Sequence, residues 1–172
     1  AIRSKVANQV KWSLVKPFLE PEFKLIEFAP GSCKFSVEVC PHVREVVGID
    51  ISDQTGGMDS LPENFHLVIY DGYDLDYERG SADMIFSDQL LEHFHPDDTE
   101  LHLSLAKDLL KPGGLYLFRT PHRHSGPHDV SAWFTDGAPE GFHLKEWTYT
   151  EFDEVLAVVD FSSWRAYRLT KG

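Results

Sequence analysis

Leu-Ile-Glu-Phe-Ala-Pro-Gly-Ser-Cys-Lys-Phe-Ser, residues 25–36, is the stretch of sequence that decides the fold. An apolar run closes on Glu27, a turn of small residues follows, and the next segment favours a helix. Such a connection aims backbone N–H groups and the positive end of a helix dipole at one point, which is how α/β proteins hold nucleotide-like ligands. A full glycine fingerprint would place Gly where this chain has Ala29 and Cys33, so the stretch needs support from the rest of the sequence.

Carboxylates at the ends of successive strands supply that support. Segments 23–28, 45–52 and 65–71 are continuous apolar runs, typical of strands buried on both faces of a parallel sheet, and they carry Glu27, Asp50 and Asp71 at or near their ends. Asp50 lies one strand–helix–strand unit after Glu27, where an acidic residue can accept hydrogen bonds from both hydroxyls of a ribose. Strand-end Asp residues also form turns, but three in series favour a binding role.

Strand and helix patterns alternate along the remaining chain. The pattern predicts strands over 82–87, 115–119 and 163–169, and helices over 1–20, 34–40, 99–110 and 150–159, with Thr150 as N-cap of the last helix. Residues 111–114 (Lys-Pro-Gly-Gly) predict a turn, and 122–141 predict a long loop over one end of the sheet. We therefore expect one doubly wound α/β domain over 1–172.

Composition excludes several classes of protein. The chain has 172 residues, of which 42% are hydrophobic, and a net charge of -12, so a nucleic-acid partner is unlikely. Cys33 and Cys40 are too few for a disulfide framework, and we expect small, buried, apolar side chains in a cytoplasmic protein. No apolar run has the length of a membrane span, and no signal peptide opens the chain.

The combined pattern resembles the class I S-adenosylmethionine-dependent methyltransferases. The matching segments are the turn at 25–33, the strand at 46–52, Asp71-Gly72, the block ADMIFSDQLLEHF at 82–94 and the turn LLKPGGL at 109–115. Together they cover the predicted cofactor core, 23–121, between the N-terminal helix and an acceptor-side region, 122–172. The resemblance implies S-adenosylmethionine as cofactor and methyl transfer to an oxygen of a small-molecule or glycan-type acceptor.

The resemblance also implies which residues hold the methionine and ribose parts of the cofactor. Glu27 and the turn Ala29, Pro30 and Gly31 would hold the methionine end. Asp50 would accept hydrogen bonds from the ribose.

The adenine and the methyl group would meet residues that follow later strands. Ile51 would pack against the adenine, and Asp71 and Gly72 would meet its edge. Ser87 and Gln89 would line the side on which the methyl group is transferred.

Two departures from the family pattern bear on activity. Ala29 and Cys33 stand where the family has glycines, and a side chain at Cys33 could crowd the cofactor or the helix packing. The family sheet also closes with a seventh, antiparallel strand, whereas this chain ends soon after the sixth, so the sheet either lacks that strand or is completed differently.

Histidines are the candidates for a general base, which helps when the acceptor is a hydroxyl. The five candidates are His93, His122, His124, His128 and His143. The spacing of His122, His124, His128 and Asp129 could also suit zinc or iron, but it lacks a helical His-x3-His frame, and we predict no metal ion.

Two other functions stay open at this level. A catalytically degenerate relative that keeps the fold as a binding or scaffold module would explain Cys33 and the short carboxyl end. A nicotinamide-dependent oxidoreductase would use a similar fold, but the missing glycines and the turn at 110–115 disfavour it.

Overall fold

A computed structural model gives the structure of the protein and describes residues 2–56, 58, 60–125 and 143–167. The described chain forms two compact units. The first comprises Ala1–Leu90 and Asp108–Arg119, and the second comprises Leu91–Lys107 and Thr120–Gly172. The single domain expected over 1–172 stays a prediction. None of the described helices is both long and apolar enough to cross a bilayer.

The first unit is built on a parallel sheet of five strands. The strands are β1 (Lys24–Phe28), β2 (Glu45–Asp50), β3 (Phe65–Ile69), β4 (Ala82–Asp88) and β5 (Leu110–Arg119). Their order in the sheet is β3-β2-β1-β4-β5, and all four neighbouring pairs are parallel. The chain order reverses across β1, and α/β sheets bind ligands outside the carboxyl ends of strands at such a point. The predicted α/β fold class is confirmed.

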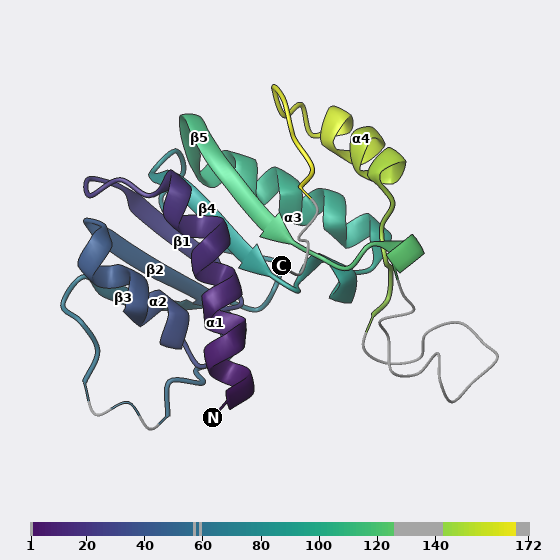
Figure 1. Cartoon of the computed structure of the whole chain (residues 1–172). Coiled ribbons are helices and arrows are strands. Elements are labelled where there is room, and N and C mark those ends of the chain that lie inside the picture. The colour runs from purple at the N-terminus through teal and green to yellow at the C-terminus, as the bar shows by residue number, and fades with distance from the viewer. Residues whose placement is uncertain (1, 57, 59, 126–142, 168–172) are drawn as a thin grey trace. The chain divides into compact units, whose positions relative to one another are not determined.

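Helices α1 (Ile2–Val15) and α2 (Lys34–Val39) lie over the same face of this sheet (Figure 1). Val15, Phe35 and Val39 join Leu25 and Phe86 of the strands in one buried cluster. The helix predicted over 1–20 stops at Val15, and residues Lys16–Phe18 form a 3-10 turn, η1.

Val6, Val10, Leu14 and Phe18 recur at the four-residue spacing of an apolar stripe on one helix face. The structure follows this stripe only in part, because the Phe18 side chain is 40% exposed. Trp12 packs edge-on against Phe35 instead, with ring centroids 5.6 Å apart, and Val15 is fully buried. Because Pro17 removes a backbone donor, the helix ends before Phe18 can complete the stripe.

The turn expected at 111–114 is instead part of β5. The register between β4 and β5 shifts between Ala82 and Met84, so the extra residues bulge out of the ladder. Gly113 has φ +82°, and a Cβ on Gly114 would lie 2.9 Å from the Leu110 side chain. Glycines therefore let the strand continue through a sequence that is typical of a turn.

The second unit contains η3 (Leu91–His93), most of α3 (Pro96–Leu109), η4 (Arg123–Ser125) and α4 (Tyr149–Val158). The N-cap of α4 is Thr148, which forms a capping box with Glu151, and the prediction of Thr150 is wrong. Thr150 lies inside the first turn of α4, after the N-cap position, and therefore does not cap the helix.

The sixth strand predicted over 163–169 is not formed in its described part. Residues 163–167 have no strand structure, and 168–169 lie outside the described residues. Trp164 Nε1 instead donates a 2.7 Å hydrogen bond to Asp153 on α4.

Candidate functional site

The turn after β1 carries backbone strain at the two positions where the sequence lacks glycine. Ala29 has φ +50° and Cys33 has φ +56°, and both non-glycine residues are in the left-handed region. Gly31, between them, has φ +55°. A Cβ in this region is unfavourable, and such strain concentrates at functional sites. Ala29 and Cys33 therefore adopt the backbone conformation that glycines would have in this turn.

Both cysteines are buried and free, as predicted. Burial, with Glu27 and Asp50 nearby, raises the pKa of the Cys33 thiol to about 11. Burial likewise raises the pKa of the Cys40 thiol to about 11. Both thiols are therefore protonated and poor nucleophiles at neutral pH.

Glu27 lies at the centre of the first unit, and its side chain is 1% exposed. Lys11 Nζ on α1 donates to Oε1 at 2.9 Å, and Ser36 Oγ on α2 donates to Oε2. The same Lys11 lies 4.0 Å from a carboxylate oxygen of Asp88 at the end of β4. Glu27 thus connects α1, α2 and the sheet, and neither oxygen faces solvent.

Asp50 joins the end of β2 to the turn after β1. Gly31 N donates to Asp50 Oδ2 at 3.1 Å, and Ser52 N donates to Oδ1 at 3.2 Å. Asp50 itself is 6% exposed, while the next side chain, Ile51, is 69% exposed. Each carboxylate oxygen has one donor and can accept a second.

Asp71 and Gly72 form a tight turn after β3. Asp71 Oδ1 accepts from Tyr73 N at 2.8 Å and from Asp74 N at 2.9 Å. The hydrogen bonds from Asp74 and Tyr73 lower the pKa of the exposed Asp71 carboxyl. Gly72 has φ +96°, which only glycine adopts readily. The Asp71 side chain therefore stabilises the turn through its Oδ1 atom.

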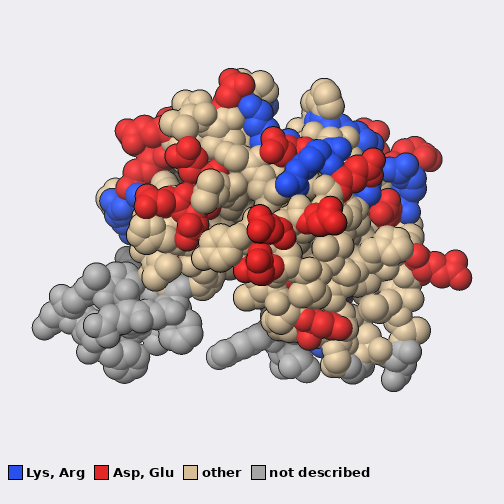
Figure 2. All heavy atoms as spheres, turned by 180° about the vertical axis from the view of Figure 1, so that it is seen from behind, with Lys and Arg blue, Asp and Glu red and all other residues tan. Residues whose placement is uncertain are grey.

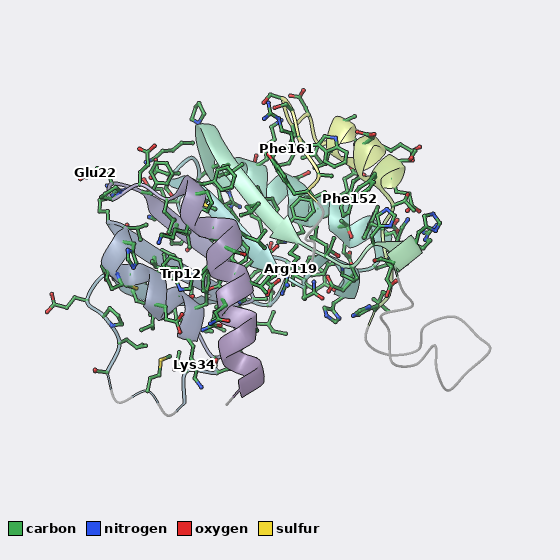
Figure 3. The ribbon with its side chains drawn as sticks, viewed as in Figure 1. Trp12, Glu22, Lys34, Arg119, Phe152 and Phe161 are labelled. Carbon is green, nitrogen blue, oxygen red and sulfur yellow. The ribbon has the colours of Figure 1, made fainter. Side chains whose placement is uncertain are left out.

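Ser87 and Gln89 flank an ion pair at the end of β4. Ser87 is buried, and its Oγ lies 2.9 Å from Tyr116 Oη on β5. Gln89 has φ +57°, and its N–H donates to Arg119 O at 2.8 Å. Between them, Asp88 accepts two hydrogen bonds from the Arg119 guanidinium, which Figure 3 labels at the end of β5.

Sequence reasoning missed three members of this arrangement, namely Lys11, Asp88 and Arg119. Asp88 was inside the quoted block at 82–94, but no pattern indicated that Arg119 would pair with it across two strands. Lys11 lies sixteen positions before Glu27 on a helix whose polar face looks solvated. The acidic residues near the ends of β1 and β4, Glu27 and Asp88, could have indicated that cationic partners are needed there.

The predicted histidine cluster is described only in part. His122 and His124 have ring centroids 5.5 Å apart, and the His122 ring also contacts Tyr149 at 4.5 Å. His122 Nδ1 accepts from His124 N at 3.2 Å. His128 and Asp129 lie outside the described residues, so their place in this cluster stays a prediction.

The other two histidines meet in the second unit, beside a glutamate that the sequence analysis did not single out. A ligand atom from each of Glu92, His93 and His143 lies within 4.8 Å of the other two. His143 Nδ1 lies 3.0 Å from Glu146 Oε1. Burial raises the pKa of the Glu92 carboxyl. The Leu-Leu-Glu-His sequence of 90–93 was the signal that could have drawn attention to Glu92.

On the face shown in Figure 2, acidic side chains are interspersed with Lys and Arg. The net charge of -12 is electrostatically unfavourable for contact with a phosphate backbone.

Solved structures share the fold at low sequence identity. One chain of the complex between the Haloferax volcanii Trm112 methyltransferase activator and a proposed methyltransferase is 16% identical, with a TM-score of 0.70 over 91% of this chain and 71% of that one. The Bacillus subtilis YcgJ protein is 16% identical, with a TM-score of 0.66 over 87% of this chain and 66% of that one.

A third structure contains a product of the cofactor. Haemonchus contortus phosphoethanolamine N-methyltransferase 1, solved with phosphoethanolamine and S-adenosylhomocysteine, is 16% identical, with a TM-score of 0.58 over 81% of this chain and 28% of that one. This chain thus spans 66% or less of the last two structures. Identities this low show a common fold and nothing about the acceptor.

The sequence itself identifies the family. No curated protein matches it. A sequence model described as a methyltransferase domain, however, matches residues 4–166. Because that match covers most of the chain, with every strand of the sheet and the three strand-end carboxylates Glu27, Asp50 and Asp71, the chain belongs to the methyltransferase domain family, within the class I superfamily that its sequence resembles.

Proposed function

We propose that this protein transfers a methyl group from S-adenosylmethionine to an oxygen atom of a small-molecule or glycan-type acceptor. Membership of the methyltransferase family supports the reaction and the methyl donor. The observation that carries the assignment of the site is the placement of Asp50, which is held by the turn after β1 and by Ser52 at the carboxyl end of β2.

The residues around Asp50 fit an adenosine. Each oxygen of the Asp50 carboxylate has one backbone donor and one remaining acceptor position, which matches the pair of hydroxyls on a ribose. Ile51 follows directly and is 69% exposed, so an apolar surface is offered beside the carboxylate. A flat base packed against Ile51 would remove that surface from water. Asp71 and Gly72 are proposed to meet the edge of the base.

The methionine end is proposed to meet the turn rather than the Glu27 side chain. Glu27 is enclosed between Lys11 and Ser36, so its part is to hold the turn in place. Ala29, Pro30 and Gly31 then form the wall that the cofactor touches. Ser87 and Gln89 are proposed for the methyl-transfer side, where Gln89 has a strained backbone.

Bound S-adenosylmethionine supplies a sulfonium methyl group with a good leaving group, so the protein's own task is to orient the acceptor and exclude water. A hydroxyl acceptor also benefits from a base that takes its proton. Imidazole suits this task near neutral pH. The described candidates are His93, His122, His124 and His143, and the contact of His143 with Glu146 has the geometry of a base held by an orienting carboxylate.

Calorimetry with S-adenosylmethionine and S-adenosylhomocysteine tests the cofactor site. Asp50→Ala should weaken binding by about tenfold to a hundredfold, because hydrogen bonds to a charged group contribute about 1.5–3 kcal/mol. Asp53→Ala is the matched control, since Asp53 is an exposed acidic residue of the following loop that accepts from Thr55. Unchanged affinity in Asp50→Ala would remove the ribose assignment, and no binding at millimolar cofactor would overturn the proposed function.

A second candidate is a binding or scaffold module that has lost catalysis. The strained Ala29 and Cys33 and the Lys11–Glu27 ion pair favour it, because all three change the wall where the methionine end would bind. The two candidates separate in a methyl-transfer assay over a panel of hydroxylated small molecules and sugars. Turnover of any acceptor by the purified chain would exclude the module.

A further inference from the structure

We infer that Glu92, His93 and His143 bind one divalent transition-metal ion of the zinc class. The site lies entirely in the second unit, where η3 meets the segment that leads to α4. The inference does not rest on the proposed function, and it replaces the prediction that the chain binds no metal.

Three side chains of two ligand types, carboxylate and imidazole, lie close together. One ligand atom from each of Glu92, His93 and His143 is within 4.8 Å of the other two. Zinc bonds of about 2.0–2.2 Å bring tetrahedral ligand atoms to about 3.4 Å apart, so these side chains need to approach by no more than about 1.4 Å. The imidazole rings of His93 and His143 meet edge to face, with centroids 5.2 Å apart and planes at 78°. This edge-to-face arrangement allows one nitrogen of each ring to face the same ion.

The Glu92 carboxylate is the independent sign of a missing ligand. Glu92 is 0% exposed, and Thr120 Oγ1 donates to its Oε2 at 3.1 Å. Among the described residues, Oε1 has no hydrogen-bond partner although it is buried. Buried polar atoms without a partner are rare and costly, and a bound ion is one of their recurring explanations. A cation bonded to Oε1 would compensate this atom.

A second layer of contacts holds the ligands in place. His143 Nδ1 is 3.0 Å from Glu146 Oε1, the carboxylate–histidine arrangement that orients a ring whose Nε2 ligates a metal. The backbone carbonyl of Glu92 accepts from Leu144 N at 2.7 Å and from Lys145 N at 3.2 Å. These two bonds fix the segment that carries His143 against the one that carries Glu92. The ligands are therefore arranged before any ion arrives.

The ligand set selects the kind of ion. Two imidazoles and one carboxylate suit Zn²⁺ and its neighbours in the first transition row, whereas Mg²⁺ and Ca²⁺ prefer oxygen ligands. Exposure rises from buried Glu92 through partly exposed His143 to exposed His93, which gives the ion a way in from solvent. Three protein ligands leave one tetrahedral position for water or for an acceptor oxygen. In this assignment His93 and His143 are metal ligands, which leaves His122 and His124 as the described candidates for the general base.

Metal loading of the full, tag-free chain tests the inference. The protein is treated with chelator, loaded with Zn²⁺ and desalted, and bound zinc is measured by mass spectrometry. We expect one ion per chain, and Co²⁺ in its place should give the visible absorption of a four- or five-coordinate site. Competition with a chromogenic chelator should show Zn²⁺ affinity lowered at least tenfold in His143→Ala and in Glu92→Gln. Glu146→Gln should weaken binding about tenfold, because outer ligands contribute less than direct ones.

His95→Ala is the matched control, since His95 is an exposed histidine two residues beyond His93 and outside the cluster. It should bind zinc like the unmodified chain. Circular dichroism checks that each variant is folded, and His93→Ala, at an exposed position, stands in for Glu92→Gln if that variant does not fold. Failure to bind zinc, or the same affinity in His143→Ala as in His95→Ala, would overturn the inference.

Discussion

Within the described part of the chain, each unit encloses one buried glutamate, and the two glutamates differ in the hydrogen-bond partners that surround them. Glu27 at the end of β1 has Lys11 on one oxygen and Ser36 on the other. Glu92 in η3 has Thr120 on one oxygen and, among the described residues, nothing on the other. A buried carboxylate without compensation destabilises a fold. The first unit therefore compensates its buried charge from within, and we assign the second to an ion from outside.

Lys11→Met should have the largest effect, because it leaves the charge on Glu27 without its cation. Both side chains are largely enclosed, at 14% and 1% exposed, and removing one partner of such a pair costs about 3 kcal/mol of the free energy of unfolding. Urea denaturation measures the loss. Lys16→Met is the control, since Lys16 is an exposed lysine of the adjoining turn.

Removing the charge as well should reverse most of that loss. The double variant Lys11→Met/Glu27→Gln has no buried charge and should recover more than half of the stability that the single variant loses. If Lys11→Met were as stable as Lys16→Met, Glu27 would not depend on Lys11, and the contrast with Glu92 would disappear.

In chelator-treated protein, Glu92→Gln should raise the free energy of unfolding, whereas Lys11→Met should lower it. Burial raises the pKa of Glu92, which shows that the enclosed site disfavours its charge. A neutral amide of the same size should therefore raise the free energy of unfolding by about 1 kcal/mol. Urea denaturation beside Glu27→Gln, which should lose stability, compares the two sites directly. A loss of stability in Glu92→Gln would mean that the chain itself already compensates this carboxylate.

A third glutamate, Glu151, gives a smaller and pH-dependent effect. Burial alone would raise its pKa, but hydrogen bonds from Thr148 and Lys145 lower the pKa of Glu151 to about 2. Thr148→Ala removes part of the capping box and should cost about 1 kcal/mol at neutral pH, whereas Thr150→Ala should cost little.

The sign of the pH dependence follows from the lowered pKa. An unfolded Glu titrates near pH 4.3, so the contribution of Glu151 is complete above that pH and is lost as the pH falls through about 2. The difference between the unmodified chain and Thr148→Ala should therefore shrink over this range in urea denaturation. If the difference in the free energy of unfolding stayed constant with pH, the cost of Thr148→Ala would come only from the lost bond between Glu151 N and Thr148 Oγ1.

Much of the first unit could be predicted because its signals are local. Continuous β-branched runs predict strands such as 45–50 wherever both faces are buried, and Glu27 and Asp50 stand at their ends in the sequence as in the structure. The turn at 29–33 was predicted too, although only the structure shows that Ala29 and Cys33 adopt the glycine conformation. The prediction of Thr150 as N-cap was wrong because Thr148, two residues earlier, forms the reciprocal capping pair with Glu151.

The second unit resisted prediction because its contacts join distant parts of the chain. Glu92 and His143 lie far apart in sequence, and no spacing rule relates them until the backbone bonds from Leu144 and Lys145 to Glu92 bring them together. The strand predicted over 163–169 is not formed over 163–167 for a related reason. Trp164 in this segment donates a hydrogen bond to Asp153 on α4, a contact that the segment's own sequence does not indicate.

The sequence by itself determined the α/β class, the family and which predicted strands end on a carboxylate. These features depend on apolar runs and on spacing within one strand–helix–strand unit. Tertiary structure alone decided which carboxylates are compensated. Lys11 reaches Glu27 and Arg119 reaches Asp88 only after the helix and the strands have packed. Packing of the second unit likewise brings ligand atoms of His143 and Glu92 within 4.8 Å of one another, but among the described residues it leaves Glu92 Oε1 without a hydrogen-bond partner. Charge compensation depends on distances of a few ångströms in space, which position along the chain does not encode.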